Sequence, residues 1–152
     1  MHGIGEREIE QLVRLLDADT TEEGMAAQAE LTHRGRGTDV VGPLLRVLPT
    51  LTRYGQLCAI EIIEELEDPR AAGPLIALLG SAHDTVREWA AYALARLRVS
   101  DAVPALRRAY RVSRDRGDPF DWSEPVGLRF ALTLLWSVAT AVIGAASFRR
   151  LR

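Results

Sequence analysis

Arginine side chains recur along the chain with a period of about 31 residues, a length at which supersecondary units repeat. Arg14, Arg46 and Arg108 occupy equivalent positions, and Ala77 takes the place between the last two. A guanidinium group is planar and binds carboxylate or phosphate through paired hydrogen bonds. If these positions share one face, they form an interrupted ladder of cations that would hold an extended acidic ligand, usually a peptide and less often a nucleic-acid backbone.

More candidate binding residues follow the last step of this ladder. Arg107 takes a position that is apolar at Val13, Leu45 and Ile76, and further arginines continue at helical spacing. A polar segment at 115–124 adds an aromatic side chain near these arginines. The predicted partner-binding residues are Arg14, Arg46, Arg107, Arg108, Arg111, Arg114 and Trp122. The alternative interpretation of the ladder is a solvated polar stripe on ordinary helices.

Catalytic chemistry has no comparable support in the sequence. There is no glycine-rich phosphate loop, no His-Glu-x-x-His pattern and no serine elbow, and the three histidines lie far apart. The single cysteine, Cys58, allows no internal disulfide and is expected to be a packed thiol. We expect no catalytic residue, no metal and no cofactor, so the chain is predicted not to be an enzyme.

Two other groups of residues have both a structural and a functional interpretation. The acidic run at 61–68 could hold metal ions through its carboxylates, but no histidine accompanies it, so a solvated helix face is expected. Trp89 and Tyr92 lie in an alanine-rich helix, where core packing is expected rather than base stacking.

A repeated supersecondary unit must position these side chains. Its equivalent positions are Leu12, Leu44, Leu75 and Leu106 in one register, and Ala27, Ala59 and Ala90 in another. Both registers advance with the same period as the arginines, which is the signature of stacked helix pairs. Neither the first helix of a pair (helix A) nor the second (helix B) can bury its apolar face alone, so the pairs stack.

The helix ends divide the chain into units within a single domain, 1–152. A leading helix at about 4–19 precedes helix pairs at 20–50, 51–81 and 82–114, an insert loop at 115–124 and a degenerate last unit at 125–152. The predicted N-caps are Thr20, Asp68, Asp84 and Ser100. We predict an all-α fold, an α-α superhelix of about four helix pairs with a leading N-terminal helix, in which the B helices line the concave side.

Three stretches of the repeat carry a family resemblance: Asp-Pro-Arg-Ala-Ala-Gly-Pro-Leu-Ile-Ala-Leu-Leu at 68–79, Val-Arg-Glu-Trp-Ala-Ala-Tyr-Ala-Leu at 86–94 and Asp-Ala-Val-Pro-Ala-Leu at 101–106. They resemble short HEAT repeats, most of all the subtype of roughly 30 residues also found in phycobilin lyases. The resemblance implies a HEAT-like solenoid that acts as a scaffold or adaptor. Some such proteins bind tetrapyrroles, and a distant helical-repeat group excises alkylated DNA bases.

The segment 130–148 contains no charged side chain other than at its flank, where Arg149-Arg150-Leu151-Arg152 follows. As one straight helix the uncharged part would span about 28 Å, close to the thickness of a bilayer core. The stretch at 141–145 matches the entry of the other B helices, so a fourth helix pair is favoured over a membrane tail. Because such a pair would lack a polar outer face, we expect 130–148 to form an interface, for example in a homodimer.

The overall charge of −2 hides an asymmetry, because residues 1–68 hold 14 acids and 6 arginines whereas residues 69–152 hold 7 acids and 13 arginines. The N-terminus does not resemble a secretory signal, so a cytoplasmic location is expected. We predict a non-catalytic module that binds a protein or an acidic peptide on its concave helix-B face. The alternatives are a nucleic-acid-binding or base-excision-type protein that uses the arginine-rich third unit, and a tail-anchored membrane adaptor.

Overall fold

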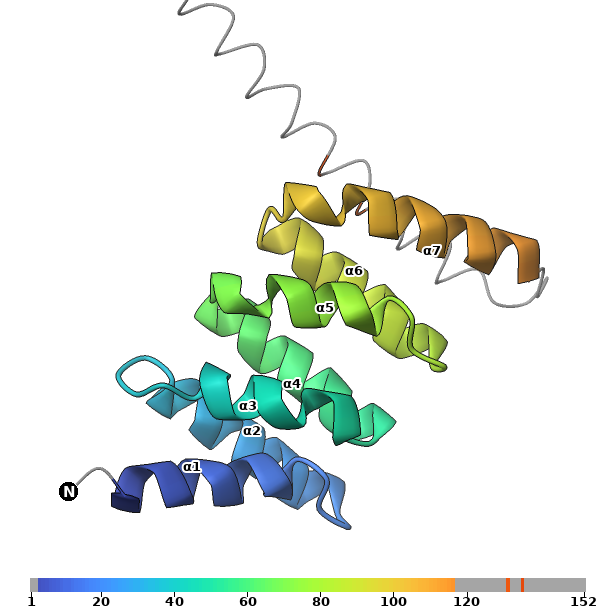
Figure 1. The fold of residues 1–152 in the computed structure, drawn as a ribbon. Helices are drawn as coiled ribbons and strands as arrows, with labels where there is room; N and C mark the ends of the chain where they lie inside the picture. Colours follow the sequence, from blue (N-terminus) through green and yellow to red (C-terminus); the bar gives the residue numbers. More distant parts are fainter. Residues whose placement is uncertain (1–2, 117–130, 132–134, 136–152) are drawn as a thin grey trace, which may run out of the picture.

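In a computed structural model of the chain, the described α-helices form two layers (Figure 1). The structure describes residues 3–116 together with Ala131 and Leu135. The helices are α1 (Gly3–Leu15), α2 (Thr21–Arg34), α3 (Val41–Val47), α4 (Arg53–Leu66), α5 (Ala72–Leu78), α6 (Asp84–Arg96) and α7 (Val103–Arg116). No β-strand occurs among these residues, and the predicted all-α repeat fold is confirmed.

The helices alternate between the two layers along the chain. Helices α2, α4 and α6 form the helix-A layer, in which α2 contacts α4 and α4 contacts α6. Helices α1, α3, α5 and α7 form the helix-B layer, which lies in front of the other in Figure 1. The leading helix α1 packs against both α2 and α3, so it occupies the place of a helix B in a half repeat.

Two threonines at equivalent positions begin the first two helices of the helix-A layer. Thr20 and Thr52 each accept a hydrogen bond from the backbone N–H three residues further on, at 3.3 and 3.2 Å. In α6 the cap position falls to His83, whose side chain makes no cap hydrogen bond, and Asp84 is the first helical residue. The predicted N-cap at Asp84 is wrong by one position, because the repeat makes His83 the equivalent of Thr52.

The B helices are joined to 3₁₀ turns: η1 (Leu48–Thr50), η2 (Pro69–Ala71) and η3 (Ser100–Ala102). Pro49 lies in the first of these turns. Asp68 begins the second, because its carboxylate accepts a hydrogen bond from the Arg70 backbone N–H at 2.9 Å. The third turn begins after Val99, so Ser100 is not the N-cap that the sequence predicts.

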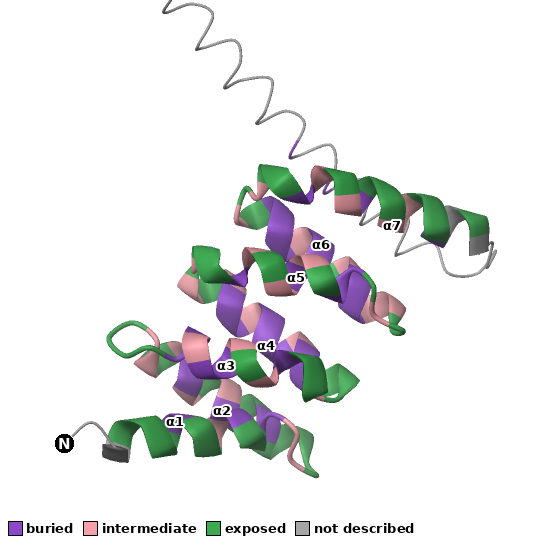
Figure 2. Ribbon diagram, viewed as in Figure 1, coloured by how far each residue is buried: buried purple, intermediate pink, exposed green. Residues whose placement is uncertain are grey.

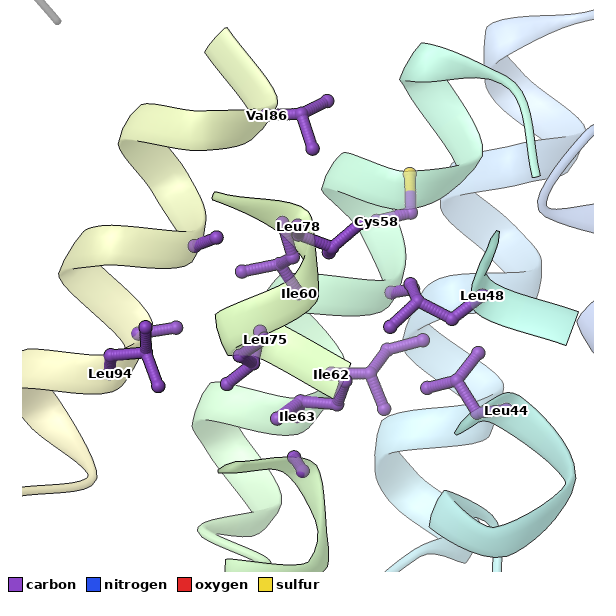
Figure 3. Packing of buried hydrophobic residues seen from close by; sticks show 14 of the residues in the cluster. Leu44, Leu48, Cys58, Ile60, Ile62, Ile63, Leu75, Leu78, Val86 and Leu94 are labelled. Carbon is purple, nitrogen blue, oxygen red and sulfur yellow. The ribbon is translucent and has the colours of Figure 1, made fainter. Parts of the chain in front are cut away.

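One hydrophobic core fills the space between the two layers (Figure 2). The alanines at the repeated positions Ala27, Ala59 and Ala90 are at most 2% exposed, and alanine lets neighbouring helix axes approach to about 8 Å. Leu48 of η1 and Ile62 of α4 are among the large side chains that gather in this core (Figure 3). The burial of the small residues is what their expected role in close packing requires.

A carboxylate joins the first half repeat to the second helix pair. Asp17, which follows α1, accepts the Thr52 backbone N–H at 3.0 and 3.1 Å and the Thr52 hydroxyl at 2.6 Å. A Cβ at Gly55 would collide with the Asp17 carboxylate, so glycine is needed for this close approach. The contact ties together two loops that are distant in the sequence.

A second polar link joins the starts of neighbouring B helices. The Arg70 guanidinium donates to Asp39 at 2.7 and 3.2 Å and to Asp68 at 2.6 Å. The Arg70 and Asp39 side chains remain about half exposed, at 52% and 55%. Hydrogen bonding to Arg70 holds the pKa of both carboxyl groups below the ordinary aspartate value.

The end of the described chain differs from the predicted unit boundary. Helix α7 continues to Arg116, into the expected insert loop. Ala131 and Leu135 are helical, at most 1% exposed, and belong to the same core cluster as the helices before them. The rest of 130–148 lies outside the described residues, so the last helix pair, the membrane tail and the dimer interface stay predictions. Within the described part, no helix has the length and apolar character needed to cross a bilayer.

Candidate functional site

Arg14 and Arg46, the first two positions of the predicted ladder, line one hollow in the helix-B layer. This α1–α3 hollow has a volume of about 150 Å³. It also contains Glu10, whose carboxylate lies 4.0 Å from the Arg46 guanidinium. An exposed ion pair at this distance contributes little stability, so a ligand carboxylate can compete with Glu10 for Arg46.

The third and fourth positions of the ladder, Ala77 and Arg108, line another hollow of about 350 Å³ between α5 and α7. Ala77 supplies no charge to this α5–α7 hollow, but Arg87 of α6 also lines it. Arg87 is only 7% exposed, and its Nη1 donates to the Ser81 carbonyl at 2.7 Å. The hollow therefore combines a fixed, buried guanidinium with the exposed one of Arg108.

A third hollow of about 530 Å³ lies between these two, where α3 and η1 face α5. Arg53 and His83, at the starts of α4 and α6, contribute its basic side chains. This α3–α5 hollow shares Ala77, Gly80 and Ser81 with the α5–α7 hollow, so the two adjoin. The grooves between successive B helices thus present a row of hollows, and each is lined by at least one arginine.

Arg87 is a site residue that the sequence interpretation missed. It lies one period after Gln56, which is 8% exposed and donates from Nε2 to the Leu48 carbonyl at 3.2 Å. Both side chains satisfy carbonyl oxygens near the end of a helix B, where the helix leaves acceptors unpaired. An alignment of the two A helices shows that a charged residue replaces a neutral one at this position, and this is the signal that could have found it.

The remaining predicted binding residues are less closely grouped. Arg107 and Arg111 are exposed on α7, where the Arg111 Nε donates to the Arg107 carbonyl at 3.4 Å, but neither lines the α5–α7 hollow. Arg114 belongs to α7, while its side chain and the whole of Trp122 lie outside the described residues. The structure therefore brings together Arg14 with Arg46, and Arg108 with Arg87.

The two layers carry opposite charges. The four described helices of the helix-B layer hold eight arginines and four acidic residues, a net charge of +4. The three helices of the helix-A layer hold four arginines and eight acidic residues, a net charge of −4. The negative charge comes from α2 and α4 and the positive charge from α7, because α6 is neutral and the charges of α1, α3 and α5 sum to zero. The division therefore follows the acidic and basic halves of the sequence.

The helix-A layer has a hollow of its own, of about 560 Å³, which we call the A-layer groove. It lies between α2 and α4 and is lined by Met25, Gln28, Ala29, Thr32, His33, Arg36, Tyr54, Leu57, Cys58, Glu61 and Glu65, together with Trp89 of α6. Trp89 is 37% exposed, so its predicted place in the core is wrong. Its position is equivalent to that of Cys58, which is 4% exposed, and an indole is much larger than a thiol.

The polar groups of the A-layer groove include one hydrogen-bonded pair and a protected thiol. Gln28 donates from Nε2 to the Glu61 carboxylate across the groove. Burial raises the pKa of the Cys58 thiol, although a hydrogen bond with the Tyr54 hydroxyl opposes this shift. The thiol is therefore neutral and packed, as predicted, rather than a nucleophile.

The acidic run at 61–68 is only partly the solvated face that the sequence predicts. Glu65 and Glu67 are exposed, whereas Glu61 is half-buried in the A-layer groove. Burial raises the pKa of the half-buried Glu64. Within the described residues, no group of three or more His, Cys, Asp or Glu side chains is placed to hold a metal ion.

Comparison with known proteins identifies the repeat. A family profile for HEAT repeats matches residues 41–117, which is half of the chain. No curated protein and no solved structure matches the sequence. The matched residues run from α3 through α7, the part of the structure where helix pairs of constant period stack in two layers. The chain therefore belongs to the HEAT-repeat family.

Proposed function

We propose that this protein is a non-catalytic interaction module that binds an extended acidic segment of a partner protein across its helix-B layer. HEAT repeats commonly mediate protein–protein interaction, and the family is typically non-catalytic. The observation that carries the proposal is the row of three hollows between successive B helices, each lined by arginine. The net charge of +4 on these helices comes from α7, so it favours an acidic ligand most strongly at the α5–α7 end of the row.

The geometry of the row suits an extended peptide. Neighbouring helices pack about 10 Å apart, so three adjacent grooves span roughly 20–30 Å. An extended chain covers about 3.3–3.6 Å per residue, which corresponds to about six to nine residues. Acidic side chains at intervals of about three residues would reach Arg46 in the first hollow and Arg108 in the last.

The expected cytoplasmic location stays a prediction.

A peptide-display selection tests this proposal even though the partner is unidentified. Random dodecapeptides are selected on the immobilised full-length protein, and the winning sequences are synthesised and measured by fluorescence anisotropy in about 0.15 M salt. We expect acidic peptides whose affinity falls at least tenfold in Arg46→Glu and in Arg108→Glu. The matched control is Arg96→Glu, which reverses an exposed arginine of the helix-A layer and should change the affinity less than twofold.

Two results would overturn the proposal. One is a selection that yields no peptide sensitive to Arg46→Glu or Arg108→Glu. The other is tight binding of a labelled single-stranded oligonucleotide that is lost in an Arg107/Arg108/Arg111→Ala variant and falls steeply with salt, while acidic peptides do not bind. That second outcome would assign the arginines to nucleic-acid backbone, because phosphate binding is strongly salt-dependent.

A further inference from the structure

Most of the exposed large hydrophobic side chains of the described residues lie in the A-layer groove. Five large hydrophobic residues of the described chain are exposed, and three of them, Met25, Tyr54 and Trp89, line this one groove. Their exposed fractions are 59%, 37% and 37%. Single exposed apolar residues are ordinary, but a cluster in a concave surface marks a place where a ligand or partner binds.

These three side chains are of the types that contribute most to binding. Tryptophan and tyrosine dominate the binding energy of protein interfaces, and they offer large apolar area at a small cost in conformational entropy. Methionine is flexible and adapts to the shape of an apolar ligand. Trp89 reaches the groove from α6, whereas Met25 and Tyr54 come from α2 and α4, so three successive repeats build one site.

Charge indicates what the groove would accept. Glu61 and Glu65 line it on successive turns of α4, and the three helices of the layer have a net charge of −4. The groove also contains two basic residues, His33 in the last turn of α2 and Arg36 in the loop that follows it. An aromatic face beside carboxylates attracts a guanidinium or ammonium group, through cation–π interaction as well as ion pairing.

We propose that the A-layer groove docks a basic segment of a second partner protein. An apolar side chain of that segment lies among Met25, Tyr54 and Trp89, and a neighbouring arginine or lysine contacts Glu61 and Glu65. This surface is separate from the arginine-lined hollows, because the groove has no lining residue in common with any of the three. The protein would then join two partners of opposite charge on its two layers.

The same display selection tests the groove independently of the helix-B layer. We expect a second class of peptides, basic and containing a large apolar residue, whose affinity falls at least tenfold in Trp89→Ala and in Glu65→Lys. These peptides should bind Arg108→Glu as tightly as the wild type. The matched control is Leu15→Ala, which removes another exposed apolar side chain (43% exposed) outside the groove and should change the affinity less than twofold.

A second variant covers the case in which Trp89→Ala unfolds at a lower temperature than the wild type. Met25→Ser removes the most exposed member of the cluster and does not disturb the core, so its effect on affinity then decides the matter. The proposal is overturned if no selected peptide depends on Met25 or Trp89, or if the dependent peptides are acidic.

Self-association is the competing use of this groove. We expect sedimentation equilibrium of the full chain to show no dimerisation through this groove, that is, no dimer that Trp89→Ala abolishes. If such a dimer exists and is also lost in Arg108→Glu, the occupant is the basic layer of a second copy rather than a partner protein, and the proposal is wrong. If no acidic peptide binds but basic peptides bind in a manner that depends on Trp89, the proposed function is wrong and the proposal for the A-layer groove holds.

Discussion

Replacing Thr52 by alanine should destabilise the protein more than the same change at the equivalent Thr20. Both threonines are N-caps of A helices, and losing such a cap costs about 1 kcal/mol. The Thr20 hydroxyl donates only to Glu23, on the first turn of the same helix, at 2.8 Å. The Thr52 hydroxyl instead donates to Asp17, in the loop after α1, at 2.6 Å.

Both hydroxyls donate to a carboxylate, but the Thr20–Glu23 bond stays within the first turn of one helix, whereas the Thr52–Asp17 bond joins two loops and therefore adds to the cost of the lost cap. A hydrogen bond to a carboxylate contributes about 1.5–3 kcal/mol when it is buried, and solvent exposure at this loop reduces it to roughly 0.5–1.5 kcal/mol. In Thr52→Ala the backbone N–H of residue 52 still donates to Asp17, so the carboxylate keeps one partner. We therefore expect Thr52→Ala to cost about 1.5–2.5 kcal/mol and Thr20→Ala about 1 kcal/mol.

Urea denaturation followed by circular dichroism measures both costs. A double-mutant cycle with Asp17→Ala and Thr52→Ala should give a coupling of about 1 kcal/mol, whereas the corresponding cycle of Asp17→Ala with Thr20→Ala should be additive within about 0.5 kcal/mol. Equal costs for the two threonines, or additive behaviour of Asp17 with Thr52, would show that the link between these loops does not stabilise the stack.

Four other changes have defined expectations. Ala59→Leu should lower the free energy of unfolding by about 1–3 kcal/mol in urea denaturation, since Ala59 is fully buried in the hydrophobic core, and wild-type stability would contradict this packing. Glu67→Gly should raise it by about 0.5–1 kcal/mol in the same assay, because Glu67 ends α4 with a φ of 50°, and an unchanged value would mean that this conformation is unstrained. Arg70 lowers the pKa of Asp39 in the folded state, so the wild type should be more stable than Asp39→Asn. This difference in the free energy of unfolding should be complete above about pH 4 and should disappear as the pH falls through the lowered pKa. A difference that does not depend on pH would exclude the ion pair as its source. Cys58 should react with iodoacetamide much more slowly in the native protein than in urea at the same pH, as judged by mass spectrometry, because burial both hinders access and raises the pKa of its thiol; equal rates would show that the thiol is accessible in the folded state.

The bounds of the A helices can be predicted from the sequence because local chemistry marks them. Helix α4 begins at Arg53 after the cap Thr52 and ends at Leu66, within the predicted unit 51–81. The sequence places the cap of α6 one position late, because Asp84 is a better capping residue than His83. The repeat register, rather than local preference, decides which of the two takes that position.

The binding surfaces can be predicted only in part. The period brings Arg14 and Arg46 into one hollow, as a ladder on one face requires. The arginine ladder does not include Arg87, which is buried in the α5–α7 hollow, because an arginine on a helix is normally exposed and only alignment with Gln56 of the preceding repeat marks this position. The A-layer groove escapes prediction for the opposite reason: Trp89 adjoins the buried Ala90 and Ala91, which favours a core position.

Departures from the repeat explain both surfaces better than the repeat itself does. At one position of helix A the side chain changes from Ala26 to Cys58 to Trp89, and only the last is large enough to extend into the groove between two other helices. At another position of helix A, the neutral Gln56 is replaced one repeat later by Arg87. Both side chains donate a hydrogen bond to a backbone carbonyl, but Arg87 also adds charge to the α5–α7 hollow. The helix pairs of a solenoid stack through residues that are alike in successive repeats. A residue that differs from its equivalents and lines a hollow is therefore not required for stacking. In this protein the two departures place aromatic area in the A-layer groove and an additional cation in the α5–α7 hollow.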